Sequence, residues 1–199
     1  NTAIGYQAMD AATTEIGNTV LGYGAAGAIR SDTADHNVII GYNAGRGGTA
    51  ATTDCVIIGS HAGESGNVGG ADNVFIGKTA GGGTWSSASM EKNIAIGTLA
   101  MGTGTKNSAD NNVAIGYKAL EDVTTGDENT VVGHMAGDTI IGGSQNVMAG
   151  YQAGNTITSG SYNTMIGSGS DGAAVHSGQI CLGYGAITSY AYGAALGYG

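Results

Sequence analysis

Apolar residues along this chain come in triplets that end at a glycine. Clear examples are "VII" at 38–40, "VFI" at 74–76 and "IAI" at 94–96, each preceded by an asparagine. Short runs of β-branched and aliphatic residues favour strands over helices. Twelve such triplets recur along the 199 residues, and each predicts one short strand.

The glycine that closes each triplet recurs every 14 to 20 residues. Asn stands four residues before it in nine copies, and Ala stands three residues after it in ten. A period of this size, sustained along a whole chain, is typical of a solenoid. We therefore expect one repeat domain over residues 1–199. Because the sequence starts and stops inside the motif, we also expect a fragment of a longer fibre. The twelve glycines are Gly5, Gly22, Gly41, Gly59, Gly77, Gly97, Gly116, Gly133, Gly150, Gly167, Gly183 and Gly197.

The coil length selects among the known kinds of solenoid. A hexapeptide β-helix needs an aliphatic residue at every sixth position. The sixth and twelfth residues after Ile40 are Arg46 and Thr52, and an aliphatic residue returns only at Ile58. Three-sheet helices use longer coils than these. Two short strands joined by two turns, a flattened roll, fit best. Coils stacked about 4.8 Å apart then give a length of roughly 55 Å.

The two faces of each predicted strand are both apolar. Side chains alternate along a strand, so the first and third residues of a triplet share one face and the middle residue takes the other. A roll buries one face inside. The other face forms a stripe larger than the few hundred Å² that monomers usually expose, so we expect cyclic self-association to cover it. The residues assigned to the trimer or core on the first face include Ile4, Ile40, Ile58, Ile76, Ile96, Ile115, Val132 and Ile166.

The repeat resembles a known family of fibres. "NNVAIG", "KNIAIG" and "DNVFIG" resemble the N-S-V-A-I-G repeat of trimeric autotransporter adhesin heads, and "NTAIGYQA" is similar to repeats of phage and prophage tail fibres. The resemblance implies an all-β, left-handed parallel β-roll of about twelve coils, with three identical chains whose first strands line a common axis. The longer coils and the Tyr after the glycine favour the fibre branch.

From this resemblance we expect a structural and host-surface-recognition segment of a trimeric extracellular fibre, part of a virion tail fibre. The alternative is the head of a bacterial trimeric autotransporter adhesin, which mediates attachment from the cell surface. The expected partners are two further copies of the chain, adjacent fibre segments and a cell-surface glycan.

Composition and charge argue against several other classes of protein. The 39 glycines come without a G-X-Y period and without any proline, which excludes collagen. Fifteen acids against six bases disfavour nucleic acid as a partner, and no apolar run reaches the roughly 18 residues of a membrane helix. Cys55 and Cys181 are too few for a disulfide framework and are expected to be buried small hydrophobes.

Aromatic residues are the main candidates for binding. Seven of the ten tyrosines directly follow the repeat glycine, among them Tyr6, Tyr42, Tyr117 and Tyr151. Stacked coils align them into partial ladders, which either pack ring on ring or stack on a glycan. Trp85, the only Trp, lies in the longest turn and is either a binding anchor or a cover for the edge of the roll.

Catalysis and metal binding are not expected. The four histidines are interpreted as solvated turn residues that share no column and have no metal-ligand spacing. Acids gather before the strands at Asp35, Asp54, Asp72, Asp110, Asp127 and Glu128, either as turn formers or as a cation site. Turns of about 8 to 12 residues are too short for the walls of a hydrolase cleft. We predict no enzyme activity, no cofactor and no metal.

Overall fold

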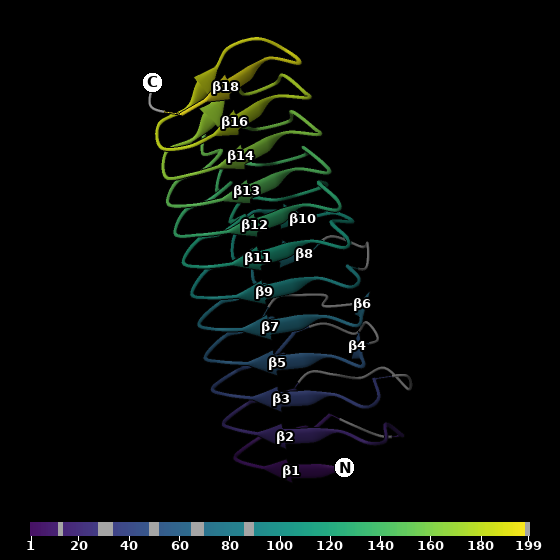
Figure 1. Ribbon diagram of the computed structural model, residues 1–199. Coiled ribbons are helices and arrows are strands. Elements are labelled where there is room, and N and C mark those ends of the chain that lie inside the picture. The colour runs from purple at the N-terminus through teal and green to yellow at the C-terminus, as the bar shows by residue number, and fades with distance from the viewer. Residues whose placement is uncertain (12–13, 28–33, 48–51, 65–69, 86–89, 198–199) are drawn as a thin grey trace.

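The protein is an all-β solenoid in which successive coils stack in parallel along one axis (Figure 1). The structure is a computed structural model that describes all residues except 12–13, 28–33, 48–51, 65–69, 86–89 and 198–199. No helix occurs among the described residues. One twelve-stranded parallel sheet runs the length of the solenoid. Its strands are β1 (Thr2–Ile4), β2 (Thr19–Leu21), β3 (Val38–Ile40), β5 (Val56–Ile58), β7 (Val74–Ile76), β9 (Ile94–Ile96), β11 (Val113–Ile115), β12 (Thr130–Val132), β13 (Val147–Ala149), β14 (Thr164–Ile166), β16 (Ile180–Leu182) and β18 (Ala194–Leu196).

Every strand of this sheet is one of the twelve predicted triplets, and successive triplets pair in register. In β5 and β7, for example, Val56 lies opposite Val74, Ile57 opposite Phe75 and Ile58 opposite Ile76. The in-register stack keeps each repeat position in a column parallel to the solenoid axis. The predicted solenoid and its strand boundaries are therefore confirmed.

The second side of the roll is less regular than expected. Six two-residue strands form three separate parallel pairs there. Elsewhere the described coils are joined on this side by turn hydrogen bonds, such as Thr124 N to Ile141 O at 2.8 Å. The prediction of a second strand in every coil is therefore confirmed only in part. The pairs are β4 (Thr52–Thr53) with β6 (Gly70–Ala71), β8 (Thr84–Trp85) with β10 (Thr105–Lys106), and β15 (Asp171–Gly172) with β17 (Ile187–Thr188).

The middle residue of the triplet faces the interior. It is buried in ten of the twelve strands, the exceptions being the two end strands β1 and β18. Alanines three residues after the repeat glycine, such as Ala62 and Ala119, pack beside these residues. The second side contributes larger side chains, including Leu120, Ile140 and Ile157. The buried middle residues are Val20, Ile39, Ile57, Phe75, Ala95, Ala114, Val131, Met148, Met165 and Cys181.

The repeat glycine is required both by its backbone conformation and by its close neighbours. At Gly41, φ is 137°, a value that side chains rarely adopt. A Cβ added there would lie 2.5 Å from the carbonyl oxygen of Gly59 in the next coil. Because the coils are in register, this backbone approach repeats along the sheet, which explains why the sequence keeps glycine at this position.

The asparagine before each strand forms the ladder that the repeat suggested. Asn129 shows the pattern: its Oδ1 accepts the N–H of Asn146 at 3.0 Å and the Nδ2 of Asn146 at 2.9 Å. Its own Nδ2 donates to Asn112 Oδ1 at 3.0 Å and to the carbonyl of Gly143 at 2.9 Å. All these groups are buried, so the asparagine ladder satisfies backbone atoms that turns would otherwise leave unpaired.

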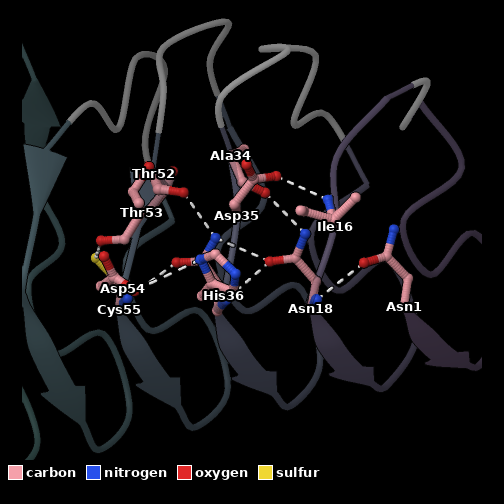
Figure 2. A network of polar contacts seen from close by, with 11 residues as sticks. Asn1, Ile16, Asn18, Ala34, Asp35, His36, Thr52, Thr53, Asp54 and Cys55 are labelled. Carbon is pink, nitrogen blue, oxygen red and sulfur yellow. Dashed lines mark hydrogen bonds and ion pairs between the residues drawn. The ribbon is translucent and has the colours of Figure 1, made fainter.

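One residue interrupts the asparagine ladder. Figure 2 shows its N-terminal part, from Asn1 and Asn18 to Cys55, which stands where the repeat has asparagine. The N–H of Asn73 meets the sulfur of Cys55 at 3.4 Å instead of an amide oxygen. Both cysteines are buried and free, as expected, and burial raises the pKa of each thiol. Both cysteines are members of the hydrophobic core, as expected, and Cys55 in addition takes the place of an asparagine in the ladder.

Candidate functional site

The outward face of the twelve-stranded sheet carries a mainly apolar stripe, in which the third residue of every triplet is apolar and four of the first residues are threonines. We define the outer stripe as the first and third residues of each triplet. Its members remain half-buried or exposed in the single chain: Ile166 is 44% exposed, and the end residues Ile4 and Leu196 are 61% and 76% exposed. The predicted trimer or core residues Ile4, Ile40, Ile58, Ile76, Ile96, Ile115, Val132 and Ile166 all lie on it.

The aromatic residues after the repeat glycine form two stacked rows. Tyr6, Tyr23 and Tyr42 stack with centroid distances of 5.2 and 5.4 Å and interplanar angles of 23° and 14°, and His61 tilts against Tyr42 at 5.2 Å. The predicted tyrosine packing is therefore confirmed. Ring faces inside such a row are covered by neighbouring rings, so a sugar meets mostly ring edges and hydroxyls there. Glycan binding by the candidate residues Tyr6 and Tyr42 of this row stays a prediction.

The second row contains a histidine. His134 directly follows Gly133, so it occupies the tyrosine column, although the four histidines share no column with one another. Its ring lies 4.9 Å from that of Tyr117 and 5.3 Å from that of Tyr151. An imidazole is flat and aromatic and can replace a phenol in a stack. Tyr117 and Tyr151, both candidate binding residues, are thus packed against a histidine.

The acids before the strands act mainly as turn formers. Asp35 Oδ1 accepts the N–H of Ile16 at 2.7 Å, as Figure 2 shows. Asp110 accepts the N–H of Glu91, and Asp127 accepts that of Asp110, each at 2.8 Å. Within the described ranges, no group of three or more His, Cys, Asp or Glu residues has an arrangement that could hold a metal ion.

A lysine lies inside the roll, which the sequence analysis did not foresee. Lys106 is fully buried, and its ammonium donates to the carbonyl oxygens of Thr103, Glu121 (3.2 Å) and Val123 (2.8 Å). Burial lowers its pKa to about 7, against the raising effect of the nearby Asp122 and Glu121 carboxylates. The signal was present in the sequence, because Lys106 precedes the buried Val123, Ile140 and Ile157 at a constant spacing of 17 residues.

Stability is expected to rise with pH because of Lys106. Below pH 7 the lysine is protonated in both the folded and the unfolded chain, so the full cost of burying the charge is present. Above pH 7 the folded chain loses the proton while the unfolded chain keeps it, and the free energy of unfolding increases by up to about 2.7 kcal/mol by pH 9. Denaturant titrations at pH 6 to 9 measure this rise.

Two variants check the source of that pH dependence. Lys106→Met removes the titrating group and should flatten the curve, whereas Lys92→Met removes an exposed lysine and should leave the rise intact. An equal rise in the parent and in Lys106→Met would contradict the assignment. Titrations stop at pH 9, below the ordinary lysine pKa of about 10.4 that applies to the unfolded chain.

Trp85 stands apart from the other candidates. Its backbone lies in β8, where it pairs with Lys106 of β10. Its side chain lies outside the described residues, so its role as a binding anchor stays a prediction. Three exposed tyrosines outside the glycine-following column, Tyr162, Tyr190 and Tyr192, were not singled out from the sequence.

Comparison with known proteins returned no relative: no family model, no curated protein and no solved structure matches this chain. In the part of the chain that the structure describes, no helix is long and apolar enough to cross a membrane.

Proposed function

We propose that this chain is a rigid structural and host-surface-recognition segment of a homotrimeric extracellular fibre, most simply a virion tail fibre. In this proposal each chain is a left-handed β-roll, and three rolls stand side by side with their outer stripes facing a common axis. The segment spaces and presents a receptor-binding region, and its outer turns contact surface glycans. We expect no catalytic activity.

The outer stripe is the observation that carries the proposal. If each of its coils leaves about 50 Å² of apolar surface exposed, one chain presents on the order of 600 Å², more than most monomers tolerate. Covering that area contributes roughly 15 kcal/mol per chain at 25 cal/mol per Å². A stripe that is straight and runs the whole length of the solenoid is best covered by identical stripes related by a rotation axis parallel to it.

The ends of the sheet support a role within a longer assembly. β1 and β18 are the terminal strands of the twelve-stranded sheet, and each presents one edge that no strand of this sheet covers. Such edges offer backbone N–H and C=O groups to another strand. We propose that an adjacent fibre segment covers the free edge of β1 and so continues the solenoid.

The alternative setting is the head of a bacterial trimeric autotransporter adhesin. The two settings use the same trimeric roll, and they differ in the rest of the polypeptide. An adhesin continues into a C-terminal membrane-anchor barrel, whereas a tail fibre carries an N-terminal region that attaches to the virion. Sequencing the full reading frame separates them, and the molar mass of the isolated chain in solution tests the shared trimer.

A further inference from the structure

The charges of this chain stop well before its C-terminal end. Residues 1–138 hold fourteen of the fifteen acids and all six bases, whereas residues 139–199 hold Asp171 alone. Asp171 is itself buried, and it accepts a hydrogen bond from Thr156 Oγ1 at 3.0 Å. The last coils, the yellow end in Figure 1, therefore present a surface almost free of formal charge.

This uncharged end is rich in exposed tyrosine. Six of the ten tyrosines lie after residue 138. Tyr162, Tyr190 and Tyr192 are 65%, 77% and 84% exposed, and within the described residues no ring stacks on any of the three. Tyrosine set among Ser, Gly and Asn, with few charges, is the composition of surfaces that bind ligands through rigid aromatic contacts and adaptable hydrogen bonds.

Tyr162 and Tyr192 belong to one column with a glycine between them. The N–H groups of Tyr162, Gly178 and Tyr192 donate to Ser144 O, Ser161 O and Ser177 O, so the three residues occupy equivalent places in successive coils. Two coils separate the tyrosines, a distance of about 10 Å along the axis.

Gly178 lets the ring of Tyr192 lie against the backbone. A Cβ added at Gly178 would be 2.5 Å from Cδ1 of Tyr192, so the ring occupies the space that a side chain would take. The Cδ1–Cε1 edge of the ring therefore lies near Gly178, while most of the side chain remains exposed to solvent. This differs from the stacked row at Tyr23, where rings cover both faces.

We infer that the C-terminal coils form a binding surface for an uncharged polysaccharide, with Tyr192 as the platform on which a sugar ring stacks and Tyr162 as a second contact. An aromatic face binds the apolar C–H face of a hexose, and the phenol hydroxyl exchanges hydrogen bonds with sugar hydroxyls. A surface without charge suits a neutral chain, because it offers nothing to pair with a carboxylate or sulfate. The inference rests on the proposed role in surface recognition and places its contact site.

Affinity electrophoresis of the folded protein tests this surface. The chain has a net charge of −9 and migrates in native gels, so retardation by polymer in the gel reports binding. The probes are dextran, mannan and galactan as neutral polymers and alginate as an anionic one. We expect retardation by at least one neutral polymer and none by alginate. Tyr192→Ala should weaken the binding tenfold or more, and Tyr192→Phe should keep most of it.

Tyr23→Ala is the matched control, because it removes a tyrosine from the stacked row and should leave the binding unchanged. Thermal melting of each variant confirms that it is folded. Equal retardation of Tyr192→Ala and the parent would overturn the inference, as would an equal loss in Tyr23→Ala, retardation by alginate alone, or no retardation by any neutral polymer. An intact trimer that binds none of these polymers would overturn this inference and leave the proposed assembly standing.

Discussion

Replacing Ile96 with aspartate is expected to lower the melting temperature of the assembled protein sharply. Ile96 lies in the middle of the outer stripe and is already half-buried in the single chain. In the proposed trimer, Ile96→Asp puts one carboxylate from each chain into an apolar environment close to two like charges. Each copy then costs several kcal/mol in desolvation and repulsion. Calorimetry at fixed protein concentration measures the shift.

Thr105→Asp is the control for added charge. Thr105 is exposed in β10, on the second side of the roll, so the same carboxylate remains in water there. We expect only a small change in melting temperature for this variant. If Ile96→Asp melted at the temperature of the parent, the outer stripe would be exposed in solution and the proposed assembly would be wrong.

The second large effect is expected in the asparagine ladder. Asn129→Leu keeps a similar side-chain volume but removes the acceptor for two buried N–H donors of Asn146 and the donor for the carbonyl of Gly143. Each buried polar group left without a partner costs about 1–3 kcal/mol, so the free energy of unfolding should fall by several kcal/mol per chain. Denaturant titration at constant chain concentration measures the loss.

Two comparisons separate the ladder from a general loss of asparagine. Asn107→Leu changes an exposed asparagine and should have little effect. Cys55→Asn restores the missing ladder member below Asn73 and should stabilise the chain by about 1 kcal/mol, the net value of a typical hydrogen bond. Equal stability of Asn129→Leu and the parent would mean that the asparagine ladder contributes nothing to folding.

The strands could be predicted because, in every repeat, the local strand propensity and the packing of neighbouring coils favour the same residues. Triplets such as 56–58 and 74–76 combine β-branched residues with a glycine that the close approach of the next coil demands, so both local propensity and the repeat point to the same strand. The alternating faces also predicted two apolar surfaces. Which face lies inside depended on the path of the rest of the coil, and only the structure showed that Ile57 and Phe75 are inside.

Other features were hidden because they depend on neighbouring coils. Thr79 and Leu99 adopt left-handed conformations, with φ of 56° and 60°, although neither residue type favours them. The in-register stack imposes this shape on whatever residue occupies the position. The buried Lys106 and the stacked His134 follow the same rule: a column fixes the environment, and an unusual residue adapts to it. Both residues can be identified from the sequence when residues one coil apart are compared with one another.

The molar mass of the isolated chain in solution tests the central claim most directly. Light scattering coupled to size-exclusion chromatography gives this mass without any assumption about shape. The proposed assembly predicts about three times the chain mass of 19.5 kDa, unchanged on dilution to micromolar concentration. A stable, soluble species of 19.5 kDa at that concentration would contradict it, because the outer stripe would then remain open to water.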